Sequence, residues 1–137
     1  MGRTRVTTWR RSINNKFLII ILCNLALVAS ACAVRPQAPS TPITSVDAIA
    51  GKWQGTVFTS NGSGSPSVMT INANGTWVGY AFGHQTHGTF TLVKGEALWK
   101  SITTGATGTW ILRMVKGMPV LDGRGSNGIS FESKRAG

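Results

Sequence analysis

Apolar and polar residues alternate along much of the C-terminal two thirds of the chain. Phe90 and Leu92 alternate with threonines, and Trp110, Leu112 and Met114 share one parity further on. A period of two is typical of a β-strand that turns one face toward a core. Because no window of this region sustains a helical period, we expect strands throughout.

Glycine-containing dipeptides divide this region into short runs rich in Thr, Val, Ile and Trp. Asn-Gly and Asp-Gly supply the positive φ that tight hairpin turns need. The expected breaks are Asn61-Gly62, Asn74-Gly75, Lys94-Gly95, Thr104-Gly105, Lys116-Gly117, Asp122-Gly123 and Asn127-Gly128. The expected strands are 52–59, 67–72, 76–82, 88–93, 97–102, 107–115, 118–121 and 128–132. We therefore predict an all-β domain, a small antiparallel β-barrel or meander of about eight short strands, and closure into a barrel would leave no long unpaired edge.

The N-terminal part of the chain has a different pattern. Five basic residues precede an apolar run at 17–30, FLIIILCNLALVAS, in which no residue is charged. A positive start, an apolar middle and small residues after it predict a secretory signal peptide over 1–31, with a hydrophobic helix. Extended to Val34, the run has 18 residues, which is the lower limit for a spanning helix. A retained anchor is therefore an alternative to cleavage.

The end of the apolar run, Ala29-Ser30-Ala31-Cys32, resembles the lipobox of bacterial lipoproteins. The resemblance implies that Cys32 is acylated with chains such as palmitate, becomes the mature N-terminus and holds the protein at a membrane of the cell envelope. Ala29 stands where that family usually has leucine, and the same residues suit an ordinary signal peptidase, so simple secretion is a second alternative.

The cysteines agree with acylation of Cys32. Cys23 lies inside the apolar run and would leave with the signal peptide, so the exported part would hold one cysteine and no intramolecular disulfide. Acylation would consume this lone thiol, which is a liability in an oxidising compartment. Ala33 follows where some lipoproteins of the inner membrane carry Asp, which favours the outer membrane.

Three prolines at a spacing of three, Pro36, Pro39 and Pro42, follow the cysteine. Proline fixes its own φ and disfavours helix in the residue before it, so we expect 32–48 to be an extended tether of about 45 Å at full stretch. The predicted organisation is a signal peptide at 1–31, the lipidation site and tether at 32–48, a β domain at 49–133 and a C-terminal tail at 134–137.

Charge adds little to this picture. The 137 residues carry a net charge of +10, but half of it belongs to the predicted signal peptide. The moderate excess of scattered Lys and Arg in the remainder is typical of a solvated surface. Export argues against a nucleic-acid partner.

Residues that catalysis or metal binding would need are scarce. His84 and His87 lie three positions apart, so they would point to opposite faces of a strand and could meet one metal ion only in a loop. No third zinc ligand accompanies them, and we expect both to be surface loop histidines. No Gly-x-Ser-x-Gly elbow occurs, and the spacing of a dinucleotide-binding loop at 123–128 is followed by a strand pattern rather than a helix. We expect no enzyme activity, no metal and no cofactor.

The sequence Gly51-Lys52-Trp53 opens the first expected strand and resembles the Gly-x-Trp of lipocalins and other calycin-like barrels. Leu98-Trp99-Lys100 and Gly108-Thr109-Trp110 are similar to hairpins of small bacterial lipocalin-like domains. The resemblance implies a barrel with one end plugged by Trp53. We expect structural roles for Trp53, Phe90, Trp110 and Phe131, and an interior filled by Trp53, Trp77, Trp99, Trp110, Phe58, Phe82, Phe90 and Phe131.

The predicted function is non-catalytic: a lipid-anchored envelope protein that binds or scaffolds through its β domain. The alternative is a miniature lipocalin-like carrier of a small apolar ligand, which requires a cavity lined by Trp and Phe and open at one end. Trp77, Tyr80 and Trp99 are the candidate ligand-binding residues, because aromatic rings stack on sugar rings and pack against apolar molecules.

Overall fold

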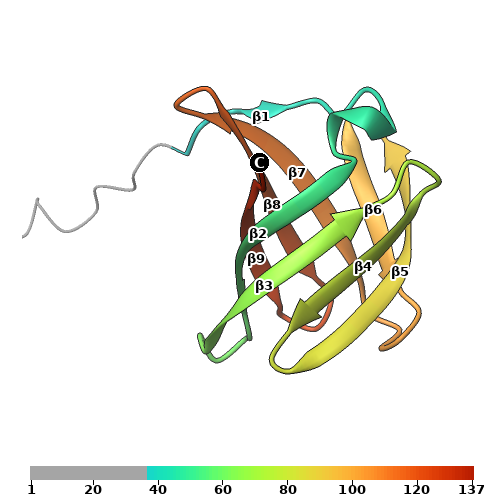
Figure 1. Ribbon diagram of the computed structural model, residues 1–137, viewed down its shortest axis with the longest axis vertical. Coiled ribbons are helices and arrows are strands. Elements are labelled where there is room, and N and C mark those ends of the chain that lie inside the picture. The colour runs from blue at the N-terminus through green and yellow to red at the C-terminus, as the bar shows by residue number, and fades with distance from the viewer. Residues whose placement is uncertain (1–36) are drawn as a thin grey trace, which may run out of the picture. The chain divides into compact units, whose positions relative to one another are not determined.

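A computed structural model describes residues 37–137, and the predicted signal peptide and Cys32 lie outside them (Figure 1). The described chain is all-β, as predicted. It contains a two-residue strand, a single 3₁₀ turn and eight longer strands. In chain order these are β1 (Ser40–Thr41), η1 (Val46–Ala48), β2 (Gly51–Phe58), β3 (Gly64–Ile71), β4 (Thr76–Ala81), β5 (His84–Val93), β6 (Glu96–Ser101), β7 (Thr107–Val115), β8 (Met118–Gly125) and β9 (Ser130–Arg135).

The strands β2 to β9 form a closed antiparallel barrel. Each strand pairs with the next along the chain, and β9 returns to β2 with a register that runs from Trp53↔Arg135 to Phe58↔Ser130. The prediction of about eight strands is confirmed, and the barrel is closed. β1 is an additional strand, which pairs with β7 outside this ring of eight.

The turns of the barrel fall alternately at its two ends, because neighbouring strands run in opposite directions. We call the end with η1 and the β3–β4, β5–β6 and β7–β8 turns the closed end. The opposite end, with the β2–β3, β4–β5, β6–β7 and β8–β9 turns, is the open end (Figure 1).

Trp53 fills the closed end of the barrel. Its side chain has 0% exposure, and its indole N–H donates a hydrogen bond to the Ile49 carbonyl oxygen at 2.7 Å. The guanidinium of Arg135 lies 5.0 Å from the centre of the indole ring and donates to the Ala48 carbonyl oxygen at 2.7 Å. The predicted tail at 134–137 is therefore wrong for its first two residues, which continue β9 and cover Trp53.

The folded part begins earlier than the predicted boundary at residue 49. Ser40 and Thr41 pair with β7, and the Ile43 N–H donates to the Gly95 carbonyl oxygen at 2.8 Å. The side chains of Ile43 and Ile49 are buried in the core. Prolines exclude helix here but allow an extended chain to lie on the barrel, so the C-terminal part of the expected tether packs onto the domain instead.

Two-residue turns occur where three dipeptides place both residues at positive φ: Phe82-Gly83, Lys94-Gly95 and Lys116-Gly117. The expected break at Asp122-Gly123 is wrong, because β8 runs through it. Gly123 lies beneath the ring of Phe131, and a Cβ at this position would collide with that ring. Here the glycine permits a close approach rather than a turn.

Replacing Lys94 by asparagine should stabilise the β5–β6 turn. Lys94 has φ 50°, a left-handed conformation that asparagine adopts at lower cost than lysine. We expect Lys94→Asn to raise the free energy of unfolding by up to about 1 kcal/mol, measured by urea denaturation. Lys100→Asn, on a strand with no such constraint, is the control, and an equal gain in both variants would contradict the explanation.

Candidate functional site

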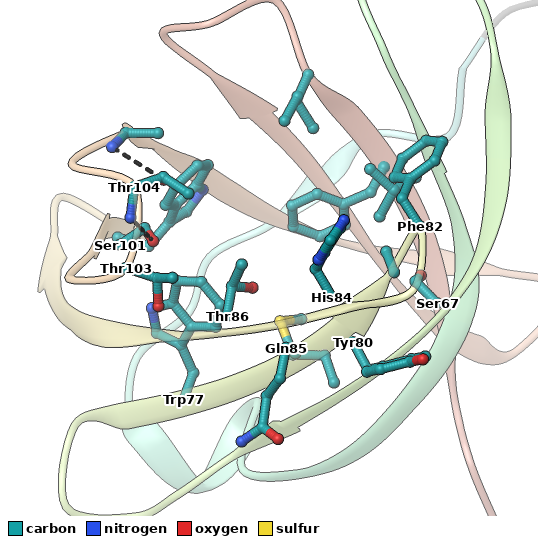
Figure 2. A pocket seen from close by; sticks show the side chains of 18 of the residues that line it. Ser67, Trp77, Tyr80, Phe82, His84, Gln85, Thr86, Ser101, Thr103 and Thr104 are labelled. Carbon is teal, nitrogen blue, oxygen red and sulfur yellow. Dashed lines mark hydrogen bonds between the residues drawn. The ribbon is translucent and has the colours of Figure 1, made fainter.

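The inner face of the barrel changes in character from one end to the other. Large side chains fill the closed half, whereas the open half is lined by small inward-facing residues. These include Ser67, Gly79, Ala81, Ser101 and Ala106. The open half therefore contains a cavity of about 500 Å³ (Figure 2). The expectation of a filled interior is wrong for this half of the barrel.

Three tryptophans make the floor of the cavity. The ring of Trp77 meets those of Trp99 and Trp110 edge to face, with centroids 6.0 Å apart in both pairs. Trp99 and Trp110 lie nearly parallel, with centroids 6.4 Å apart. Offset and edge-to-face contacts are the favourable geometries for aromatic pairs, so each ring helps to fix the others. The floor is consequently apolar and well packed.

Only one of the three indole N–H groups of the floor has a hydrogen-bond acceptor among residues 37–137. That of Trp77 donates to the Thr89 carbonyl oxygen at 3.3 Å. Those of Trp99 and Trp110 are buried and have no acceptor among the protein atoms of residues 37–137. A buried donor without an acceptor costs about 1–3 kcal/mol. Neither nitrogen is exposed to the empty cavity, so a molecule bound there would reach these N–H groups only if the rings moved.

The mouth of the cavity is polar. His84 and Thr86 of β5 share the inward parity of Gly88 and Phe90, and Figure 2 shows His84, Thr86 and Thr103 around the cavity. Within the described part of the chain, no Lys, Arg, Asp or Glu side chain lines it. A charged group placed inside would lose its hydration without gaining an ionic partner, which is unfavourable.

Hydrogen bonds fix the β6–β7 turn at this mouth. The buried hydroxyl of Ser101 accepts from the Thr104 N–H at 3.1 Å, and the Thr104 hydroxyl accepts from the Ala106 N–H at 3.3 Å. These bonds hold the turn against the end of β6. The β6–β7 side of the cavity rim is therefore held in place by hydrogen bonds.

The expectation that the two histidines lie in a surface loop is wrong, because both belong to β5, and their spacing of three puts them on opposite faces of that strand. His87 points away from the cavity, and its Nδ1 lies 3.1 Å from the Thr103 hydroxyl. Among residues 37–137, no group of three or more His, Cys, Asp or Glu side chains is placed to hold a metal ion.

The structure gathers the three candidate ligand-binding residues around this one cavity, but in different positions. Trp77 and Trp99 are buried in the floor, so neither offers an exposed ring for stacking. Tyr80 lies at the rim on the outward parity of β4 and is 55% exposed. This arrangement suits an enclosed apolar molecule better than a sugar ring on an open aromatic platform.

The cavity itself could have been anticipated from strand parity. Phe58 and Phe82 were expected to fill the interior, but they are 40% and 41% exposed. Phe58 lies five positions after the inward-facing Trp53 on one strand, which gives it the opposite parity, and Phe82 is a turn residue. Without these two rings, small residues face each other across the open half.

No helix in the described range 37–137 is both long and apolar enough to cross a membrane. The chain matches no family model, no curated protein and no solved structure.

Proposed function

We propose that this protein is a non-catalytic binding protein, exported and anchored by acylation of Cys32, that holds a small uncharged apolar molecule in the open half of its barrel. The cavity above the three tryptophans carries the proposal. Its volume of about 500 Å³ falls within the range of about 300–1,000 Å³ that is usual for small-molecule sites. The acylated cysteine would keep this binding domain at the cell envelope.

The chemistry of the walls defines the class of ligand. An apolar body fits the tryptophan floor together with Met69 and Phe131, and the lack of charged lining residues in the described chain disfavours ionic ligands. The ligand would therefore be a neutral apolar molecule.

The resemblance to lipocalins supports a carrier role. Trp53 stands in the Gly-x-Trp sequence, and an arginine near the end of the last strand packs on its ring. A stopper at one end and a cavity at the other are what a carrier of this kind requires. The polar mouth would then be the route by which the ligand enters and leaves.

A pair of probes with one aromatic skeleton tests the proposed selectivity. N-phenylnaphthylamine is neutral, whereas anilinonaphthalenesulfonate adds a sulfonate to a similar skeleton. Titration monitored by tryptophan fluorescence and by probe emission should show the neutral probe bound with one-to-one stoichiometry and at least about tenfold more tightly. Equal affinities, or tighter binding of the anion, would contradict an uncharged cavity as the binding site.

Filling the cavity should abolish this binding. Gly79 faces inward, and a Cβ placed there would lie 3.5 Å from the nearest atom of Trp77, so the first carbon of a larger side chain fits. The remaining atoms of Gly79→Leu would occupy the cavity, and we expect the affinity for N-phenylnaphthylamine to fall at least about tenfold. Val78→Leu, on the outward face of the same strand, is the matched control. Unchanged affinity in a folded Gly79→Leu variant would place the probe elsewhere.

A further inference from the structure

The β7–β8 hairpin at the closed end exposes apolar side chains around a lysine. Met114, Val115 and Met118 flank the Lys116-Gly117 turn, and Met118 is 51% exposed. Exposed methionine and valine side chains at the tip of a hairpin lose contact with water only if something covers them. They are therefore candidates for a docking surface.

The described chain begins beside this hairpin. Ser40 pairs with Arg113 and Thr41 with Leu112 in antiparallel register, so the residues before Ser40 run toward the hairpin tip (Figure 1). Arg113 fixes their course, because its Nη1 donates to the Ala38 carbonyl oxygen at 2.5 Å. Asp122 in turn holds Arg113 by an ion pair of 2.5 Å.

The proposed anchor is close to this point along the chain. Only residues 33–36 separate Cys32 from Gln37, the first described residue. Five residue steps span at most about 18 Å, which is much shorter than the 45 Å expected for a tether that ends at residue 48. Acyl chains on Cys32 would thus keep the β7–β8 side of the closed end within about 18 Å of the bilayer surface.

The charge of the closed end suits an anionic bilayer. Lys94 and Lys116 lie in its turns, and Lys52 is the second residue of β2 at the same end. Lys134 and Arg135 add two further cations near the end of β9, against Asp47 and Glu96 at the same end. Basic residues close to anionic headgroups are attracted, whereas no Lys or Arg among residues 37–137 lines the mouth of the cavity at the opposite end.

We propose that the closed end is a membrane-facing surface. Met114, Val115 and Met118 reach the boundary between headgroups and acyl chains, and Lys116 and Lys94 bind anionic headgroups. The mouth of the cavity then points away from the bilayer into the aqueous space. This orientation rests on the proposed acylation of Cys32.

Depth-dependent quenching in vesicles tests the orientation. The full chain is produced in acylated form, its Cys32 is verified by mass spectrometry, and it is inserted into vesicles of phosphatidylethanolamine and phosphatidylglycerol. A fluorophore is attached through Met118→Cys, and in a second sample through Asn61→Cys in the β2–β3 turn at the open end. Nitroxide lipids should quench the fluorophore at position 118 and leave the one at 61 unchanged. Equal quenching at the two positions, or none at 118, overturns the proposal.

Charge reversal supplies a second measurement. Lys94→Glu and Lys116→Glu together should reduce the quenching at position 118 in anionic vesicles. Each lysine removed lowers the equilibrium constant for contact of the closed end with the anionic surface by about fivefold. Undiminished quenching contradicts the role of the lysines. Shielding of the fluorophore that grows with protein concentration in lipid-free detergent indicates a second copy of the chain and overturns a lipid partner.

The outcomes separate this orientation from the proposed function. An unmodified Cys32 refutes the anchor and the membrane-facing surface together. An acylated Cys32 with an unquenched fluorophore at 118 refutes the surface alone. Loss of probe binding in Gly79→Leu is measured at the other end of the barrel and reports on the cavity in either case.

Discussion

Replacing Trp53 by alanine is expected to lower the free energy of unfolding by about 3–5 kcal/mol, the usual cost of truncating a buried tryptophan. The residue is fully buried at the closed end, and its loss would leave a void among Ile43, Ile49 and the strands around them. It would also leave the Ile49 carbonyl oxygen without its donor and Arg135 without its ring. For a domain of this size the unfolding temperature should fall by roughly 15–30 °C.

Two further variants separate the contributions of Trp53. Trp53→Phe keeps an aromatic stopper but removes the N–H donor, so its loss should be smaller than that of alanine. Phe58→Ala changes an outward ring on the same strand and should cost under about 1.5 kcal/mol. Calorimetry or circular dichroism measures all three. A Trp53→Ala protein as stable as Phe58→Ala would show that the closed end does not depend on this residue.

The strands were predictable because strand parity depends on local patterns, whereas the choice between a barrel and a meander depends on the pairing of β9 with β2. Phe90 and Leu112 face the core as their alternation predicts, and the eight expected strands all occur. Met114 shares the parity of Leu112 but is exposed, because β7 extends past the end of the barrel. Alternation gives the face of a strand and says nothing of where the barrel ends.

The features that were missed depend on contacts between distant parts of the chain. Arg135 meets Trp53 only because β9 returns to β2, and Ser40 lies on β7 through antiparallel pairing with Arg113, whose side chain also binds the Ala38 carbonyl oxygen. Asp122-Gly123 has the composition of a turn, and only the ring of Phe131 above it shows that the glycine serves close packing. None of these contacts leaves a short-range signal in the sequence.

The cavity favours the carrier of a small apolar ligand, which was the alternative from sequence, over a protein that binds or scaffolds through its outer surface. A filled barrel would leave only its outer surface for binding, whereas this barrel leaves half of its interior open. Small inward residues and buried indole N–H groups without acceptors both reduce stability, since they forgo packing and hydrogen bonds. Proteins tend to depart from such rules of packing at functional sites, which favours a ligand in this space.

Replacing Gly88 by alanine should be among the most disruptive single-carbon changes in the barrel wall. A Cβ at Gly88 would collide with the Lys100 carbonyl oxygen on β6 and come within 2.8 Å of the Trp77 indole nitrogen. The carbonyl belongs to the backbone of the paired strand, so relief requires the two strands to separate. We expect Gly88→Ala to cost at least about 3 kcal/mol, at the upper limit for overpacking.

Gly79→Ala is the matched control for this change, because it adds the same atom to an inward glycine of the neighbouring strand. Its Cβ would meet no atom closer than 3.5 Å, and replacing glycine in a strand should stabilise the protein by about 0.5–1 kcal/mol. Urea denaturation of the two variants should therefore give shifts of opposite sign. Because Trp77 lies in the cavity floor, Gly88→Ala should also weaken binding of N-phenylnaphthylamine under conditions in which it remains folded. Equal stabilities would mean that β5 and β6 part at this position without cost, and that the close approach of these strands does not set the position of Trp77.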